Sequence, residues 1–257
     1  MTHNTQSRIV DGATTAVLFI HGILGTPRHF SHILPLVDYV PDSVSYCNLQ
    51  LPGHGGTVGD FSKSSMKQWK KAAWDAFDQL TKTHKHVVVV GHSMGTLFAL
   101  QLAIEFPEKV AFLFLIAAPI RPWVSINGMV CCLRSAFDCA REDHPAEMAI
   151  LQAGGTRLTK KLWCYIPWIP HMLALLYEAR VTEGLLPQLN TKTIVYQSRR
   201  DEMVALRSGK ILQGISCVSL TTLDCSTHFY YPAEEMKIVC SAFTDALTQL
   251  SDNGITK

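Results

Sequence analysis

The chain has 257 residues, 47% of them hydrophobic, and a formal net charge of +2. This length suits one large α/β domain, or one domain carrying an insertion. The near-neutral charge, without a basic stripe interleaved with aromatics, excludes a nucleic-acid partner, and no apolar run approaches the ~18 residues of a membrane span, which excludes a stable membrane anchor.

Apolar strands alternate with helical stretches along the chain, the pattern of a doubly wound, mostly parallel sheet. A short strand is also possible at Arg8–Val10, before the first clear strand. Residues 4–7 and 251–257 are expected to be loosely ordered chain ends. The predicted strands are Ala16–Ile20, Val44–Leu49, His86–Val90, Val110–Ala117, Thr193–Gln197 and Cys217–Leu223. The predicted helices are Arg28–Leu36, Met66–Thr83, Ser93–Phe106, Val204–Gly214 and Ala233–Leu250.

Residues 120–186 interrupt the alternation, because they are far longer than one crossover needs. Proline and glycine divide this stretch into several short helices rich in large apolar residues. We therefore expect a helical lid at 120–186, inserted into an α/β core made of 1–119 and 187–257. Many of its side chains would hold the lid to the core, and some would line a substrate pocket. Our candidates for substrate binding in the lid are Trp123, Met129, Trp163 and Trp168.

The eight cysteines include no CxxC pair, and Cys47, Cys217 and Cys240 fall inside predicted elements. Free thiols are the expected state for such positions in a long chain. The first fifteen residues are polar and lack the apolar centre of a signal peptide. Together these features favour a cytoplasmic protein. The eleven histidines form no HExxH arrangement, so neither a metal nor another cofactor is predicted.

The segment Gly91-His92-Ser93-Met94-Gly95 follows four consecutive valines and precedes an apolar helix. A G-x-S-x-G pattern on such a strand-to-helix turn predicts a nucleophile elbow. Glycines two positions either side of the serine remove the Cβ atoms that would collide on so sharp a turn. Ser93 is therefore the expected nucleophile. The competing interpretation is a serine in an ordinary loop.

A serine hydroxyl needs a base and an orienting carboxylate to become a good nucleophile at neutral pH. Asp201 follows the strand at 193–197, and His228 follows the last strand, so both would lie at the sheet edge that carries Ser93. Asp224 is a second candidate for the carboxylate, although it follows a different strand. Glu202, next to Asp201, would point elsewhere on the turn.

The oxyanion formed by attack on a carbonyl requires two N–H donors. One expected donor is the backbone amide of Met94, the residue after the expected nucleophile. The other is the backbone amide of Ile23, in the loop after the first clear strand. Gly22 lets this loop turn toward Ser93, and we assign Gly22 and Leu24 to substrate binding. His21 is expected to tie the loop down through hydrogen bonds.

With these residues placed, the chain resembles the α/β-hydrolase superfamily, and within it the bacterial carboxylesterase and monoacylglycerol lipase branch. The resemblance implies a mostly parallel sheet of six or seven strands, and a two-step ester hydrolysis through an acyl-enzyme. It also makes His54 a structural residue near the mouth of the site. The motifs that carry it are HGILG at 21–25, LPGHG at 51–55, GHSMG at 91–95, RDEMV at 200–204 and STH at 226–228.

The motifs are much less specific about the substrate, a small-molecule ester. The apolar lid favours short- to medium-chain acyl esters or monoacylglycerols, with aromatic esters also open. A proline-type aminopeptidase and a thioesterase are alternatives on the same fold. A hydrolase fold that only binds ligands is a further alternative. The oligomeric state is not indicated by any feature of the sequence.

Overall fold

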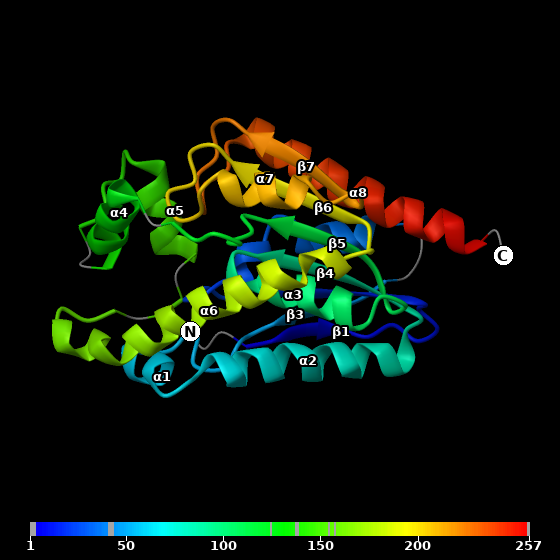
Figure 1. The fold of residues 1–257 in the computed structure, drawn as a ribbon, viewed down its shortest axis with the longest axis horizontal. Coiled ribbons are helices and arrows are strands. Elements are labelled where there is room, and N and C mark those ends of the chain that lie inside the picture. Colours follow the sequence, from blue (N-terminus) through cyan, green and yellow to red (C-terminus); the bar gives the residue numbers. More distant parts are fainter. Residues whose placement is uncertain are drawn as a thin grey trace.

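The structure is a computed structural model that describes residues 4–40, 44–123, 125–136, 139–153, 155–156 and 158–255, with only the backbone described at 127, 129, 132, 135–136, 153 and 251–255. Its centre is a seven-stranded sheet in the order β1-β3-β2-β4-β5-β6-β7 (Figure 1). All neighbouring strands are parallel except β1, which runs antiparallel to β3. The predicted fold class is thereby confirmed. The strands are β1 Gln6–Arg8, β2 Thr15–Ile20, β3 Ser45–Leu49, β4 His86–His92, β5 Val110–Ile116, β6 Thr193–Ser198 and β7 Val218–Leu223.

The central strands are apolar on both faces, because helices cover the sheet on each side. In β4, Val87 and Val89 pack in one hydrophobic cluster, and Val88 and Val90 pack in the other. This alternation follows from the two-residue period of a strand. Helices α2 and α3 contribute to the first cluster, and α8 to the second. The helices are α1 Val58–Ser62, α2 Met66–Thr83, α3 Met94–Glu105, α4 Ile126–Ala136, α5 Pro145–Ala153, α6 Ile169–Leu185, α7 Arg207–Gln213 and α8 Ala233–Ile255, with short 3-10 helices η1 Pro27–Phe30, η2 Leu34–Tyr39, η3 Leu162–Trp168 and η4 Leu186–Gln188.

Three local predictions were wrong. The helix expected at 28–36 is two 3-10 helices, because Pro35 lacks an N–H and disfavours helical geometry in the residue before it. The helix expected from Val204 begins only at Arg207, since Val204 forms a bridge with Pro122. The strand expected as a stub at 8–10 is β1 at Gln6–Arg8, so residues 6 and 7, expected in a loose end, pair with β3.

Helix α1 was not predicted, although its start carries a recognisable signal. The Thr57 side chain accepts a hydrogen bond from the amide of Asp60, and the Asp60 side chain accepts one from the amide of Thr57. This reciprocal pair is a capping box. Its helix is only five residues long, too short for apolar periodicity to reveal.

Residues 120–186, which we call the inserted segment, lie between β5 and β6 and contain α4, α5, η3, α6 and η4. Figure 1 shows α4, α5 and the start of α6 beyond the ends at which the parallel strands finish. The other part of α6 packs against α3, and η3 packs against α1. The segment is thus joined to the core at one end and projects over the edge of the sheet at the other.

No helix within the described residues is both long enough and apolar enough to cross a bilayer. Three cysteines expected as free thiols, Cys47, Cys217 and Cys240, are free, with Cys47 buried and the other two half-buried. Burial raises the pKa of the Cys47 thiol to about 11, so this side chain behaves as a small apolar group.

Candidate active site

Ser93 lies on the turn between β4 and α3 with φ 51° and ψ −125°. A non-glycine residue at positive φ is strained, and such strain is typical of functional turns. The Ser93 amide donates to the carbonyl oxygen of Ile116 at 2.9 Å, which holds the turn against β5. Thr96 donates to the Ser93 carbonyl through both its amide and its hydroxyl, at 2.9 and 2.7 Å. These bonds fix the strained turn at the first residue before helix α3.

The glycines around this turn are required by close approach. A Cβ at Gly95 would lie 2.0 Å from the carbonyl oxygen of Ile20, and one at Gly22 would lie 2.8 Å from Cβ of Ser93. The loop after β2 therefore lies directly against Ser93 at Gly22. Leu24 in that loop has φ 59°, and the Gly25 amide donates to the Gly22 carbonyl at 3.1 Å to close the turn.

His21 anchors the same loop. Its Nε2 accepts a hydrogen bond from the amide of Leu51 at 3.1 Å, so its protonated Nδ1 donates to the Gly22 carbonyl at 2.8 Å. This ring is completely buried and also contacts His54 edge-on. Burial lowers the pKa of His54 well below its ordinary value, with the His21 ring as a second cause. Both rings pack beneath the loop.

Asp201 and His228 meet at the ends of β6 and β7. The Nδ1 atom of His228 lies 2.9 Å from Oδ2 and 3.0 Å from Oδ1 of Asp201. The Asp201 carboxylate also accepts from the amides of Met203 and Val204 at 2.8 and 2.7 Å. Its side chain is fully buried, so these donors replace water around the charge. The carboxylate orients the imidazole and leaves Nε2 for other chemistry.

Three effects set the protonation of His228. Burial lowers its pKa, but the charge and hydrogen bond of Asp201 and the charge of Glu202 outweigh burial, so the pKa is raised above its ordinary value. The imidazolium is therefore stabilised where it would form during proton transfer. Such a directed shift is common at functional sites.

Glu202 was expected to point away, yet its side chain is buried behind the histidine. Its Oε2 atom accepts from the backbone amide of His228 at 3.0 Å, and its Oε1 atom is buried without a hydrogen bond to another described group. Burial raises the Glu202 pKa. The carbonyl of Glu202 also accepts from the amide of Ser125 at 2.8 Å, so one residue contacts both the His228 loop and the base of the inserted segment.

The alternative carboxylate, Asp224, lies elsewhere. It is exposed and pairs with Arg199 at 2.5 Å. Its backbone amide, with those of Cys225 and Ser226, donates to Glu235 on the first turn of α8 at 2.8 to 2.9 Å. Glu235 thus fastens the loop that leads to His228. The sequence offered only a weak signal for it, an acid in the first turn of a helix.

His92, the residue before Ser93, contacts the opposite side of the histidine. Its Nε2 atom is 3.1 Å from the carbonyl oxygen of His228, and the two ring centroids are 5.0 Å apart. Burial and the positive charge that His228 can carry lower the His92 pKa to about 3. A neutral His92 therefore donates to the His228 carbonyl across the whole range in which His228 titrates.

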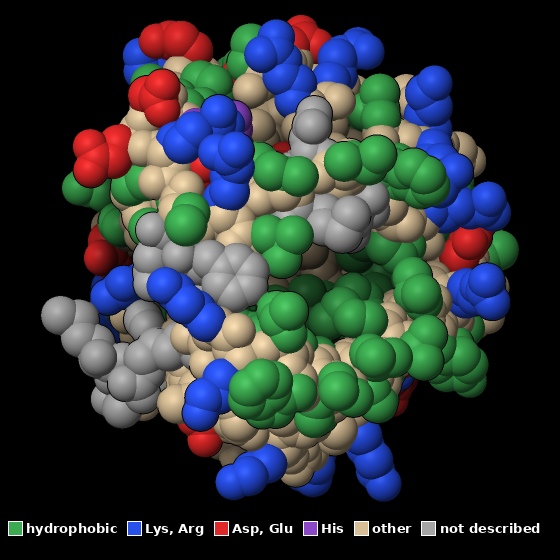
Figure 2. Space-filling view, turned by 90° about the vertical axis from the view of Figure 1, so that its left-hand side faces the viewer, with side chains coloured by type: hydrophobic (Ala, Val, Ile, Leu, Met, Phe, Trp, Pro, Cys, Tyr) green, Lys and Arg blue, Asp and Glu red, His purple; other side chains and the backbone are tan. Residues whose placement is uncertain are grey.

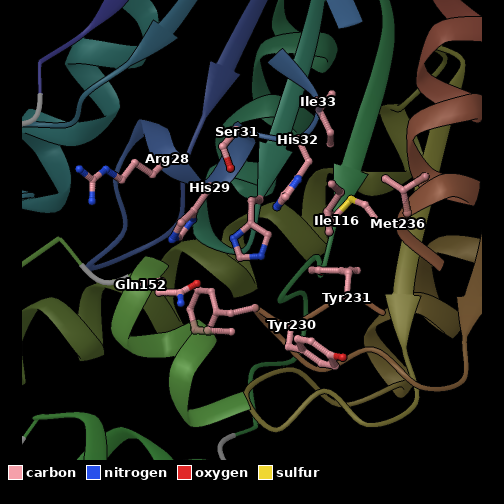
Figure 3. Close-up of a pocket in the computed structure, with 14 residues that line it drawn as sticks. Arg28, His29, Ser31, His32, Ile33, Ile116, Gln152, Tyr230, Tyr231 and Met236 are labelled. Atoms are coloured by element: carbon pink, nitrogen blue, oxygen red, sulfur yellow. The ribbon is translucent and has the colours of Figure 1, made fainter. Parts of the chain in front are cut away.

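A cavity of about 540 Å³ opens beside these residues. It reaches His92 and Phe229, the chain neighbours of Ser93 and His228, whereas Ser93 itself is not part of the wall. Figure 3 shows that its walls come from η1 and the residues after it, from α5 and from the segment before α8. The polar lining groups are Arg28, His29, Ser31, His32, His92, Gln152, Tyr230 and Tyr231, without a carboxylate among the described lining residues.

The residues assigned to substrate binding lie in different surroundings. Trp168 is buried, and its Nε1 donates to the Ser62 hydroxyl at 3.0 Å, so it fastens the inserted segment to α1. Trp123 and Trp163 are exposed, the former with Arg207 over its ring. The side chain of Met129 is outside the described residues. Gly22 and Leu24 are in the loop against Ser93, and the Leu24 carbonyl accepts from the amide of Gly155 at 3.4 Å.

One group of possible metal ligands occurs among the described residues, formed by Cys131, His144 and Glu147 in the inserted segment. The completely buried Glu147 carboxylate is engaged by Arg141 at 2.8 Å, with Arg134 at 3.9 Å. Two guanidinium groups would repel a dication at this position. The group is better explained as an internal ion-pair anchor between α4 and α5.

Two curated proteins share part of the sequence. The protein PHYLLO of Arabidopsis thaliana is 29% identical over 104 residues, 37% of this chain and 6% of that protein. An acetyltransferase component of the acetoin cleaving system of Cupriavidus necator is 32% identical over 106 residues, 41% of this chain and 27% of that protein. The match therefore spans well under a third of either relative.

Solved structures match the whole fold. A structure described under the metagenome-derived lipolytic enzymes LipS and LipT superposes with a TM-score of 0.67 at 19% identity, covering 96% of this chain and 99% of that one. The esterase Est1E of Butyrivibrio proteoclasticus, with ferulic acid bound, gives 0.62 at 15% identity, covering 99% and 96%. A structure from a study of carboxylesterases of Nitrososphaera gargenis gives 0.64 at 14% identity, covering 95% of each chain.

These similarities at low identity establish the architecture. The sequence profile of the Alpha/beta hydrolase family matches residues 17–239, from within β2 to the first turns of α8. The chain belongs to the Alpha/beta hydrolase family.

Proposed function

We propose that the protein is a serine hydrolase that cleaves carboxylic esters, with Ser93 as nucleophile, His228 as base and Asp201 as the orienting carboxylate. The observation that carries the proposal is the buried Asp201–His228 hydrogen bond of 2.9 Å, at the sheet edge where Ser93 occupies a strained turn. The lipolytic and esterase structures of the same fold support an ester as the substrate.

In the first step, His228 Nε2 takes the proton of the Ser93 hydroxyl while Oγ bonds to the ester carbonyl carbon. The imidazolium then gives that proton to the departing alcohol oxygen as the carbon–oxygen bond breaks, leaving an acyl-enzyme. In the second step water repeats the sequence: His228 accepts its proton, hydroxide adds to the acyl carbon, and the proton returns to Ser93 as the acid leaves. Asp201 remains ionised and stabilises the imidazolium in both steps.

The negative oxygen of each tetrahedral intermediate requires donors already in place. We assign them to the amides of Met94, the first residue of α3, and Ile23, next to the glycine that touches Ser93. The helix start adds the positive end of its dipole at the same point. Since only backbone atoms donate, their apolar side chains are compatible with an acyl group nearby.

We further propose that the inserted segment is a lid, and that the substrates are short- to medium-chain acyl esters or monoacylglycerols. Its position over the sheet edge supports the lid, and its many apolar side chains support the substrate class. A series of p-nitrophenyl esters of increasing chain length, with a monoacylglycerol and a cinnamate ester added, tests this. Rates that peak at medium chains support it, whereas a preference for the cinnamate ester contradicts it.

The nucleophile is tested directly with a fluorescent phosphonate that labels activated serines. Wild type should be labelled at Ser93, as found by mass spectrometry of the modified peptide, and Ser93→Ala should remain unlabelled. Ser241→Ala, at an exposed position on α8, is the matched control and should label as wild type does. An unlabelled but folded wild-type protein would instead support a ligand-binding module.

A further inference from the structure

The exposed apolar side chains of this protein are concentrated in one region. Of the 17 large hydrophobic residues that are exposed among the described ones, 14 lie between Trp123 and Tyr177. Single exposed apolar residues are ordinary, but a contiguous group marks a surface that meets a partner or a membrane. The inserted segment therefore exposes an apolar surface to water that a partner or a membrane could cover.

The densest part of this surface comes from η3 and the first half of α6, and we call it the apolar face. Its six most exposed members are between 57% and 68% accessible, namely Leu162, Trp163, Ile166, Ile169, Leu173 and Tyr177. On the opposite side of the same helix, His171, Glu178 and Thr182 are buried toward the core. The outer side of the first half of α6 is thus apolar, although the outward side of a surface helix is ordinarily polar.

The stretch of sequence that leads into and forms the apolar face contains lysines and no acidic residue. The sequence from Met148 to Tyr177 contains no aspartate or glutamate, and Lys160 and Lys161 are exposed at its beginning. Figure 2 shows this end of the molecule, where hydrophobic side chains surround a hollow and Lys and Arg side chains lie around them. Apolar side chains with tryptophan and tyrosine, bordered by lysines, are the composition of segments that lie in a lipid interface.

We propose that the apolar face docks reversibly on an anionic lipid surface, with its large side chains at the level of the acyl boundary and Lys160 and Lys161 at the headgroups. A second copy of the chain is the less suitable occupant. In a two-fold interface the same patch meets itself. Because residues 148–177 contain no aspartate or glutamate, the face of a second copy offers these lysines no anionic group. Anionic headgroups would instead neutralise both lysines. Docking places the hollow of Figure 2 against the lipid.

The proposal is tested by sedimentation of the full chain with vesicles of phosphatidylcholine, with and without phosphatidylglycerol. Using Ser93→Ala prevents any turnover of lipid and makes the result independent of the proposed esterase activity. We expect binding that is clearly stronger with phosphatidylglycerol. Replacing Lys160 and Lys161 by alanine should weaken binding to these vesicles by about tenfold or more, since each lysine near such a surface contributes about 1 kcal/mol.

The apolar contribution is tested with Trp163→Ser and Leu173→Ser together, which should weaken binding to both kinds of vesicle by at least about tenfold. The matched control is Ile9→Ser with Ile238→Ser, two exposed apolar positions away from this region, and it should bind as the parent does. Absence of vesicle binding would overturn the proposal. An equal loss of binding in the Trp163/Leu173 variant and in the Ile9/Ile238 control would also overturn it. So would a dimer in analytical ultracentrifugation that the Trp163 and Leu173 substitutions dissociate.

Discussion

The sheet core and the inserted segment are built from the same kinds of apolar residue, yet the two regions use them in opposite ways. In α3, ten of the twelve residues are buried, and β4 is almost completely enclosed. In η3, only one of seven residues is buried, although the segment is equally apolar in sequence. Composition alone therefore does not indicate which apolar residues stabilise the fold.

The difference follows from what covers each region. Strands of the core have helices on both faces, whereas the outer side of η3 and α6 has no other element of the described chain above it. Removing apolar atoms from the core leaves a cavity, but removing them from the outer side of α6 leaves only water. We therefore expect the core to determine the free energy of unfolding and the residues at the ends of the parallel strands to determine the reaction. The inserted segment should determine which substrates and surfaces the protein binds.

The largest effect is expected at the sheet edge between the two regions. Asp201→Asn should retain the fold but reduce kcat by about 10⁴-fold, because an amide favours the wrong imidazole tautomer. Asp224→Asn is the matched control. Because the Asp224 carboxylate is exposed, its replacement should change kcat by less than about threefold. Steady-state hydrolysis of a p-nitrophenyl ester measures both. The reverse order of the two effects would assign the acid role to Asp224.

The next effect separates the core from the inserted segment by stability. Phe98→Ala removes a completely buried ring from α3 and should lower the free energy of unfolding by about 3–5 kcal/mol. Leu173→Ala removes an exposed side chain from α6 and should change it by less than about 0.5 kcal/mol. Urea unfolding followed by circular dichroism measures both. Similar losses would mean that the outer side of α6 is covered in solution.

A smaller effect is expected at Glu202, which contacts both regions. Glu202→Ala leaves the buried His228 amide without its acceptor and should lower kcat by about tenfold, with KM little changed. Glu202→Gln retains an acceptor oxygen and should restore most of the rate. If the two variants were equally impaired, the negative charge of Glu202 rather than its hydrogen bond to the backbone would be what matters.

The smallest effect concerns pH. His228 must be neutral to accept the Ser93 proton, and the net effect of burial, Asp201 and Glu202 raises its pKa above 6.5. The rate should therefore fall as pH decreases through a midpoint above 6.5. In Asp201→Asn one cause of the raised pKa is lost, so the midpoint of the residual activity should move to lower pH. A kcat/KM profile measures both, and a midpoint that does not move would exclude His228 as the titrating group.

The central strands and the strand-to-helix turn at Ser93 could be predicted because the patterns that indicate them are local in sequence. Consecutive valines require burial on both faces, and Gly91 is required by its close approach to Thr96 in the same turn. Gly95 is instead required by the carbonyl of Ile20 on β2, a contact that only the folded sheet brings about. Two local errors have local causes, since Pro35 divides the first predicted helix and α1 is too short for apolar periodicity to indicate it. The roles of Trp168 and Trp163 could not be separated in this way. Both are aromatic residues in one apolar stretch, yet one is bonded to Ser62 and the other faces water.

By itself, the sequence determined the six parallel strands and the main helices α2, α3 and α8, the turn at Ser93, and the positions of Asp201 and His228 after their strands. Each of these depends on neighbours along the chain. Only the tertiary structure decided the orientation of Glu202, the contact of His92 with His228 and the outward side of α6. Each of these depends on segments far apart in sequence that meet when the sheet forms. A local sequence pattern indicates which residues favour burial. The packing of elements that are distant in sequence decides which of those residues are actually buried.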